Sequence, residues 1–290
     1  MKVLITGASG FIGQYVLKRL ESCGIDTVAI GRTLPKNCSP KNFKQVDLID
    51  HSNFDDLLSD IGATHLLHLA WYTEHGDYWE STLNLDWMQA SVNLVKAFCK
   101  AGGQNVVMAG TCAEYDWSFG YCIEDKTPLR PSTLYGFAKD MTRRQALAVC
   151  TDYRVNLAWG RIFFVFGPGE DNRRLLPSLS EVFKGKRGPF GINNEAYRDF
   201  LHVEDVAAGF LTLLDVNAFG NYNICSGEPV QLKELAKIIA WKNGKEAKEV
   251  LELSTVRIGD PEFLVGNNRK IKEKGWNSQP LVEAIKKNEW

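Results

Sequence analysis

The chain has 290 residues, a formal net charge of −1 at pH 7, 44% hydrophobic residues and 24% charged residues. This is ordinary globular composition, and it excludes a disordered tail, a collagen-like chain and a coiled-coil rod. The length suits one large domain, or one domain with a smaller lobe. A basic excess typical of nucleic-acid-binding proteins is missing, so we expect no nucleic-acid partner.

Membrane, export and metal signals are also missing from the sequence. No apolar run approaches the roughly 20 residues that span a bilayer, and no signal peptide is recognisable, so we expect a cytoplasmic protein without a membrane partner. Seven cysteines occur, and none forms a CxxC pair. That pattern favours free thiols in a reducing compartment over disulfides or a zinc site, so we expect no metal.

Short apolar runs alternate with amphipathic runs along the first half of the chain. Strands are predicted, in chain order, at residues 2–6, 27–30, 43–46, 65–69, 105–109 and 155–160. Helices are predicted between them at residues 11–22, 53–60, 84–101 and 135–150. Because parallel strands need crossover helices, this alternation predicts an α/β fold with a Rossmann-type doubly wound parallel sheet.

The pattern changes after about residue 166, where Gly-Pro turns separate smaller elements. Helices are predicted there at residues 203–216 and 232–241. We therefore divide the chain into a dinucleotide-binding domain, 1–166, and a smaller, mainly substrate-binding C-terminal lobe, 167–290. Some segments of the second part are expected to return to the first sheet. A ligand should lie between the two parts, at the carboxyl ends of the strands.

A glycine-rich segment, TGASGFIG at residues 6–13, follows the first predicted strand and opens the first helix. Gly7 allows a tight turn, Gly10 lets the backbone approach a pyrophosphate, and Gly13 permits close packing of helix and strand. The helix N-terminus directs free N–H groups at phosphates. The predicted cofactor contacts of this segment are Gly7, Ser9, Gly10, Phe11, Ile12 and Gly13.

The end of the second strand distinguishes NAD from NADP. An acidic residue there would hold the ribose 2′-hydroxyl of NAD, whereas an arginine accommodates the 2′-phosphate of NADP. This sequence has Arg32 and Thr33 at that point and no acidic residue. We therefore expect NADP as the cofactor, with NAD less favoured. Asp47 and Leu48, after the third strand, are expected near the adenine.

A tyrosine and a lysine stand four residues apart in YGFAK, at 135–139. On a helix Tyr135 and Lys139 share one face. An ammonium group beside a phenol favours the phenolate and lowers the pKa of the tyrosine. Thr111, at the end of the fifth predicted strand, offers a hydroxyl that can bind a substrate oxygen.

These motifs resemble the extended short-chain dehydrogenase/reductase family, which acts mostly on nucleotide-linked sugars. The resemblance covers nearly the whole chain. Beyond the segments already quoted it includes HLAW at 68–71, Asn84, RIFFVFGPG at 161–169, RDFLHVEDVA at 198–207 and NYNICSG at 221–227.

The resemblance implies roles for particular residues. Thr111, Tyr135 and Lys139 would form the catalytic triad, and Lys139 would also hold the nicotinamide ribose. Leu69 and Ala70 would pass beside the cofactor. The implied substrate-binding residues are Thr111, Arg198, Trp71 and Asn172. The resemblance also implies a nucleotide-sugar substrate and a homodimer that pairs the helices at 84–101 and 135–150.

The residues after Thr111 bear on the reaction. Sugar-nucleotide dehydratases of the family that this chain resembles carry an acid and a base directly after the catalytic threonine. This chain has Cys112 and Ala113 at those positions, so dehydration is disfavoured. Glu114 is expected to point elsewhere, and we interpret Cys112 as a small buried residue. The aromatic residues between 71 and 87 either wall a sugar pocket, pack a lid or belong to the core.

The segment AGTCAEYDW at 109–117 resembles reductases of 4-keto deoxysugar nucleotides. We therefore expect NADPH-dependent reduction of the 4-keto group of a nucleotide-linked 6-deoxy-4-keto-hexose, with dTDP as the first candidate nucleotide. Two alternatives stay open. One is a nucleotide-sugar 4-epimerase without net redox change, and the other is a non-catalytic regulator that binds NADP.

Overall fold

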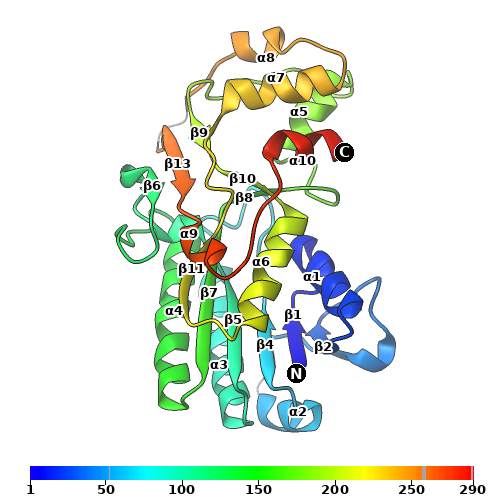
Figure 1. Ribbon diagram of the computed structural model, residues 1–290, viewed down its shortest axis with the longest axis vertical. Coiled ribbons are helices and arrows are strands. Elements are labelled where there is room, and N and C mark those ends of the chain that lie inside the picture. Colours follow the sequence, from blue (N-terminus) through cyan, green and yellow to red (C-terminus); the bar gives the residue numbers. More distant parts are fainter. Residues whose placement is uncertain (52, 257–258, 289) are drawn as a thin grey trace.

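A parallel sheet of seven strands forms the base of the protein (Figure 1). The computed structural model describes residues 1–51, 53–256, 259–288 and 290. The strand order is β11-β7-β5-β4-β1-β2-β3, and every neighbouring pair is parallel. The strands are β1 (Lys2–Thr6), β2 (Asp26–Gly31), β3 (Phe43–Gln45), β4 (His65–His68), β5 (Asn105–Thr111), β7 (Asn156–Ile162) and β11 (Gly220–Ile224). The predicted Rossmann-type α/β fold is confirmed.

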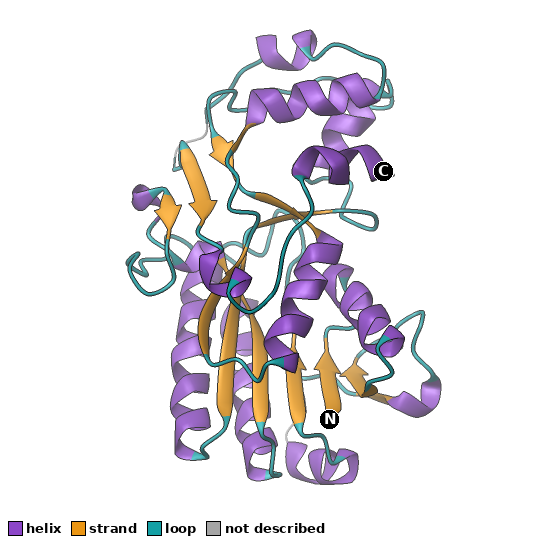
Figure 2. Ribbon diagram, in the orientation of Figure 1, coloured by secondary structure: helices purple, strands orange, loops and turns teal. Residues whose placement is uncertain are grey.

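Side chains that alternate along the strands separate the core into two layers. Val3 and Ile5 belong to one buried cluster, and Leu4 between them belongs to the other. The helices α1 (Phe11–Ser22) and α6 (Val203–Asp215) cover the first face, and α2 (Phe54–Ile61), α3 (Leu83–Lys100) and α4 (Leu134–Asp152) cover the second (Figure 2). Because both faces are covered, the central strands β1 and β5 are almost continuously buried.

Strand ends differ from the predicted ones by up to two residues. β5 and β7 each continue two residues beyond the predicted end, so Thr111 is the last residue of β5. Asp26 is the first residue of β2 rather than a residue before it, and it therefore lies at the amino end of the strand, away from the carboxyl edge. Strand β1 pairs with both β2 and β4, so the order of strands reverses beside β1.

The second part of the chain contributes to both layers of the molecule. β11 pairs with β7 as the outermost strand of the large sheet, and α6 packs against α1. The remaining helices stand above the carboxyl edge of the sheet (Figure 1): α5 (Leu175–Phe183), α7 (Leu232–Lys242), α8 (Lys248–Glu252), α9 (Arg269–Lys272) and α10 (Leu281–Lys287). Two small sheets accompany them, β10 (Phe200–His202) with β8 (Phe164–Phe166), and β12 (Val230–Gln231), β9 (Tyr197–Arg198), β13 (Phe263–Gly266) and β6 (Tyr121–Cys122).

One buried carboxylate connects three segments of this upper part. Asp199 accepts hydrogen bonds from the backbone N–H groups of Ser226, Gly227 and Gly266, and from the Ser226 hydroxyl. A buried charge is tolerated when several donors surround it. The contact fixes how β9, the turn after β11 and the end of β13 meet.

Within the described ranges, no helix is long and apolar enough to cross a membrane, and no group of three His, Cys, Asp or Glu side chains is placed to hold a metal ion. All seven cysteines are free, and six of them are buried. The Sγ atoms of Cys99 and Cys150 are 3.9 Å apart.

We predict that α3 and α4 pair with their counterparts in a homodimer. Leu83 and Leu85 on α3 and Phe137 on α4 are exposed apolar side chains that an isologous four-helix interface would bury. Light scattering at micromolar concentration should give twice the mass of one chain, and the double variant Leu85→Glu/Phe137→Glu should halve it. A wild-type mass of one chain contradicts the prediction.

Candidate active site

A cavity of about 710 Å³ lies at the carboxyl edge of the large sheet. This is the position expected for a ligand of a doubly wound sheet. Of the residues predicted from the sequence, the lining contains Gly7, Ser9, Gly10, Phe11, Ile12, Gly13, Arg32, Thr33, Asp47, Leu48, Leu69, Ala70, Trp71, Thr111, Tyr135 and Lys139. Segments as far apart in the sequence as Gly7 and Arg174 thus meet in one cleft.

The glycine-rich loop forms a cradle in which side chains do not fit. Gly7 has φ +72°, and a Cβ added to it would lie 2.6 Å from the backbone nitrogen of Ala70. A Cβ on Gly13 would lie 2.0 Å from the carbonyl oxygen of Gly7. The backbone N–H of Gly10 donates to the same oxygen, at 3.0 Å. The loop therefore leaves its backbone and the N-terminus of α1 open to the cavity, which suits a pyrophosphate.

A neutral histidine on β4 is hydrogen-bonded to the first residue of this glycine-rich segment. His68 joins the Thr6 hydroxyl through Nδ1 and the Ser91 hydroxyl through Nε2, each at 2.8 Å. Burial lowers the pKa of His68 to about 3, so the ring carries no charge at neutral pH. Thr6 accepts a hydrogen bond from the N–H of Ala70, and this bond holds Ala70 beside Gly7.

Arg32 lies just beyond β2 and lines the cavity with Thr33. Its side chain is exposed, and its carbonyl oxygen accepts a hydrogen bond from Gln45. Asp47, an acidic residue of the neighbouring loop, also lines the cavity and accepts a hydrogen bond from the N–H of Ile49. The adenosine end of a dinucleotide would meet the guanidinium group of Arg32 at the mouth of this cleft.

Thr111, Tyr135 and Lys139 converge at the inner end of the cavity. Thr111 ends β5, and Tyr135 lies in the first turn of α4. The Thr111 hydroxyl lies beside the Tyr135 phenol, where the contact between them acts to lower the pKa of the phenol. Lys139, one turn further along α4, donates to the carbonyl oxygen of Ala109 at 2.9 Å, and its Nζ lies 3.8 Å from the ring centre of Trp71.

The phenol has a raised pKa, which differs from the expectation that Lys139 would lower it. Burial raises the pKa of Tyr135, and the hydrogen bond with Thr111 only partly opposes this. Burial also lowers the pKa of Lys139 to about 7, against the opposing charge of Glu114. The ammonium group is engaged by Ala109 and Trp71, so desolvation dominates at the phenol.

An aromatic wall surrounds the Tyr135 ring. The ring of Tyr78 is edge-on to Tyr135 at 4.9 Å, Trp79 at 5.8 Å and Trp71 at 6.5 Å. Buried Asn84 orders this wall, because it accepts from the Trp71 indole N–H at 2.8 Å and donates to the carbonyl oxygen of Tyr78. Tyr78 and Trp79 therefore wall the cavity, whereas Trp87 is also part of the buried core and Tyr72 packs against that core.

Two predicted substrate residues lie outside the cavity lining. Arg198 is buried and ion-paired with Asp260, 62 residues away, and also donates to the carbonyl oxygen of Tyr197. Asn172 is exposed. Its neighbours Asp171 and Arg174 line the cavity instead. Arg174 was missed in the sequence because two adjacent arginines after a Gly-Pro turn belong to no recognisable motif.

The residues after Thr111 behave as expected. Cys112 touches the cavity but is buried in a cluster with Tyr115 and Phe163, and burial raises the pKa of its thiol. Glu114 turns away from the cavity and is buried in the core, where it forms an ion pair with Arg161. No carboxylate therefore stands where a dehydratase would need its acid and base.

The fold and the glycine cradle define a Rossmann-type dinucleotide-binding protein. The family model described as "NAD dependent epimerase/dehydratase family" matches residues 3–225. The chain belongs to this family.

The names of several similar proteins describe enzymes that act on nucleotide sugars. The chain is 27% identical to a dTDP-6-deoxy-L-talose 4-dehydrogenase (NAD(+)) of Aggregatibacter actinomycetemcomitans, over 80% of this chain and 87% of the relative. It is 25% identical to a CDP-abequose synthase of Salmonella typhimurium, over 94% and 92%. The solved structure of MoeE5 in complex with UDP-glucose and NAD is similar at 26% identity, with TM-score 0.82, over 98% of this chain and 96% of that chain.

We predict that Gly13→Ala weakens dinucleotide binding at least about 10-fold, because the added Cβ meets backbone that must move. Inside an ordinary helix the same change stabilises by about 0.5–1 kcal/mol. Gly188→Ala, where a Cβ meets nothing within 4 Å, is the control. Fluorescence titration with NADPH measures both variants, and equal affinities would contradict the cradle.

Proposed function

We propose that this chain reduces the 4-keto group of a nucleotide-linked 6-deoxy-4-keto-hexose, with NADPH as the reductant. The observation that carries the proposal is that Thr111 and Tyr135 lie side by side in the lining of the dinucleotide cleft. Two hydroxyl groups that face the same point can bind one carbonyl oxygen. An oxygen held by two donors is polarised and stabilised as negative charge develops on it.

The chain's own residues then complete the reduction. When bound, a reduced nicotinamide dinucleotide supplies the hydride. Tyr135 gives its phenolic proton to the developing alkoxide oxygen, and Thr111 keeps its hydrogen bond to the same atom. Lys139, whose pKa is about 7, lies close enough along α4 to stabilise the phenolate that forms. The aromatic wall excludes water from this point.

The state of the phenol supports reduction over oxidation as the first step. A reduction starts with a protonated donor, and burial raises the pKa of Tyr135, so the phenol holds its proton at neutral pH. An epimerase that begins by oxidising its substrate needs the phenolate as a base. The alternative of a non-catalytic regulator is disfavoured because Thr111, Tyr135 and Lys139 all meet in the cavity.

The substrate class is supported by the wall and by the relatives. Trp71, Tyr78 and Trp79 offer apolar surface beside Tyr135, which suits a sugar that carries a methyl group next to the reacting carbon. A 4-dehydrogenase of a dTDP-linked 6-deoxysugar is among the similar proteins, and the reverse of such an oxidation is a 4-keto reduction. We take dTDP as the first nucleotide to test.

A second candidate, a nucleotide-sugar 4-epimerase, is favoured by the family description itself. Both reactions would use the same three residues, and they differ in whether NADPH is consumed. We would incubate the purified protein with NADPH and dTDP-, GDP-, CDP- or UDP-linked 4-keto sugars. With the 4-keto sugars we expect loss of NADPH absorbance equal to the product formed. In a separate incubation with nucleotide-linked hexoses that carry a 4-hydroxyl group, 4-epimerisation without net change of the cofactor would establish the epimerase.

The preference for NADPH rests on Arg32 alone, because similar proteins are described with NAD. No carboxylate occupies residues 30–33, and the exposed guanidinium lines the cavity where the adenosine end is expected. Charge-assisted hydrogen bonds to a 2′-phosphate contribute about 1.5–3 kcal/mol, which is a preference of about 10- to 100-fold.

Replacing Arg32 tests this directly. Arg32→Asp removes the guanidinium, repels the phosphate and offers an acceptor to a ribose 2′-hydroxyl, so the variant should prefer NADH where wild type prefers NADPH. Lys44→Asp, an equal charge change at an exposed site on neighbouring β3, should leave the preference unchanged. The measurement is kcat/KM with each cofactor, and equal use of both by wild type would contradict the proposal.

The proton donor is tested with Tyr135→Phe, which keeps the ring and removes the hydroxyl. We predict a kcat loss on the order of 10²-fold or more with NADPH affinity retained, because only the proton transfer is affected. Tyr153→Phe, at the exposed far end of α4, should retain kcat. Near-wild-type turnover by Tyr135→Phe would refute the assignment of the donor.

A further inference from the structure

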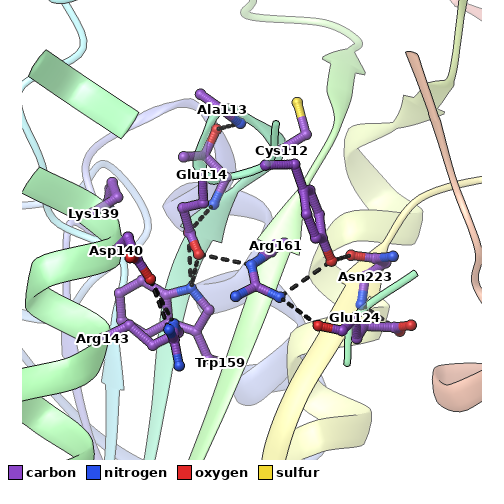
Figure 3. Close-up of polar contacts among 12 residues, drawn as sticks. Cys112, Ala113, Glu114, Glu124, Lys139, Asp140, Arg143, Trp159, Arg161 and Asn223 are labelled. Atoms are coloured by element: carbon purple, nitrogen blue, oxygen red, sulfur yellow. Dashed lines mark hydrogen bonds and ion pairs between the residues drawn. The ribbon is translucent and has the colours of Figure 1, made fainter. Parts of the chain in front are cut away.

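Glu114 has a fully buried carboxylate three residues after Thr111 (Figure 3). One oxygen, Oε1, accepts from the backbone N–H of Thr111 at 2.8 Å and from the Trp159 indole N–H at 2.9 Å. The other oxygen, Oε2, accepts from Nε of Arg161 at 2.7 Å and from the same indole at 3.1 Å. A side chain that faces away from the cavity therefore makes direct contact with the backbone of a residue that lines it.

These contacts close a tight turn around Thr111. The Thr111 hydroxyl accepts from the N–H of Ala113 at 3.2 Å, while the Glu114 carboxylate accepts from the N–H of Thr111, so each end of the turn caps the other. A Cβ added to Gly110 would lie 2.0 Å from Nε1 of Trp159 and 2.7 Å from Oε1 of Glu114. The carboxylate is thus packed so closely under the strand end that only glycine fits there.

The same turn also supports Tyr135. A Cβ added to Gly136 would lie 2.2 Å from the carbonyl oxygen of Ala113, so the first turn of α4 rests directly on the residue before Glu114. Movement of the turn would displace the Thr111 hydroxyl and the Tyr135 helix relative to each other. A shift of about 1 Å between reacting groups is enough to cost about 100-fold in rate.

We propose that Glu114 is a positioning residue of the reaction. Its carboxylate holds the Thr111 backbone from the core side and fixes the distance between the Thr111 and Tyr135 hydroxyls, while Arg161 neutralises its charge. This inference rests on the proposed use of Thr111 and Tyr135 to bind and protonate the substrate oxygen. In this proposal Glu114 contacts neither the substrate nor the cofactor.

Arg161 is itself held in a buried chain of polar groups. Its Nη1 donates to the Tyr115 hydroxyl at 3.1 Å, and that hydroxyl donates to Oδ1 of Asn223 at 2.7 Å, on outer strand β11 (Figure 3). Nη2 of Arg161 has no hydrogen-bond partner among the described residues. The guanidinium is therefore incompletely satisfied, and this makes replacement of both charges by neutral side chains feasible.

Two matched double variants distinguish the effect of the acceptor at residue 114 from the effect of the two buried charges. Glu114→Gln/Arg161→Met keeps an oxygen acceptor for Thr111 and Trp159 and removes both buried charges. Glu114→Leu/Arg161→Met removes the same charges and the acceptor as well. Replacing a buried ion pair by neutral groups of similar volume is often neutral for stability, whereas removing one partner alone leaves an uncompensated charge. Thermal unfolding and NADPH titration check that both variants fold and bind cofactor.

We expect the Gln variant to keep kcat within about 3-fold of wild type and the Leu variant to lose at least about 10-fold, with KM for NADPH unchanged in both. Equal and nearly full kcat in both variants would overturn the proposal, since Glu114 would then be structural only. Equal loss in both would also overturn it, because the charge and not the acceptor would be what matters.

A fallback keeps the test decisive if the Leu variant does not fold. Glu114→Asp with Arg161 retained keeps the charge and shortens the reach to the Thr111 N–H, so kcat should fall at least about 5-fold. Unchanged kcat in a folded Glu114→Asp protein would overturn the proposal.

Failure of the proposed function is seen separately, because wild type would then not reduce the 4-keto sugar. The comparison can be repeated with the epimerase reaction, which uses the same two hydroxyls.

Discussion

The active edge of this protein depends on a buried ion pair, Glu114 with Arg161, whose side chains are both fully inaccessible to water. Breaking such a pair by removing one partner costs about 3–5 kcal/mol, against a net stability of about 5–15 kcal/mol for a whole domain. The pair joins the end of β5 to β7, and Thr111 and the turn under α4 are built on that junction.

The opposite side of the cleft depends on backbone rather than on charge. Gly7 and Gly13 allow β1, α1 and the segment at Ala70 to approach so closely that no side chain fits between them. Neutral His68 connects β1 through β4 to α3 and keeps this region free of buried charge. The molecule thus places an uncharged cradle for phosphates in the cavity, while the network of buried charges lies in the core behind Thr111.

The desolvation that forms the reaction site also determines its proton chemistry. The phenol of Tyr135 and the ammonium of Lys139 are both shifted toward their neutral forms by burial. In the proposed reduction the neutral phenol would be the proton donor, and the lysine would act as a cation once the phenolate has formed. The i, i+4 spacing in the sequence predicts their proximity, but it does not predict the direction in which burial shifts the phenol.

Residue patterns within short segments were sufficient to predict the layers of the fold and the cofactor cleft. The alternation at Val3, Leu4 and Ile5 and the glycine spacing at 7, 10 and 13 report short-range geometry, which one sequence contains in full. Partners distant in sequence were not predictable. Arg198 pairs with Asp260, and Arg161 lies 47 residues beyond Glu114, and in neither case does a periodicity link the two charges. Arg174 enters the cavity only because the upper part of the chain folds back over the sheet.

We propose that this cleft delivers a hydride to a sugar carbonyl with net oxidation of the cofactor. Transfer of deuterium tests it most directly. With NADPH deuterated at the transferable position of the nicotinamide and a dTDP-linked 6-deoxy-4-keto-hexose, the account predicts one deuterium at C4 of the sugar for each NADPH consumed. A 4-hydroxy product without deuterium at C4, or turnover of a nucleotide sugar with NADPH unchanged, would contradict it.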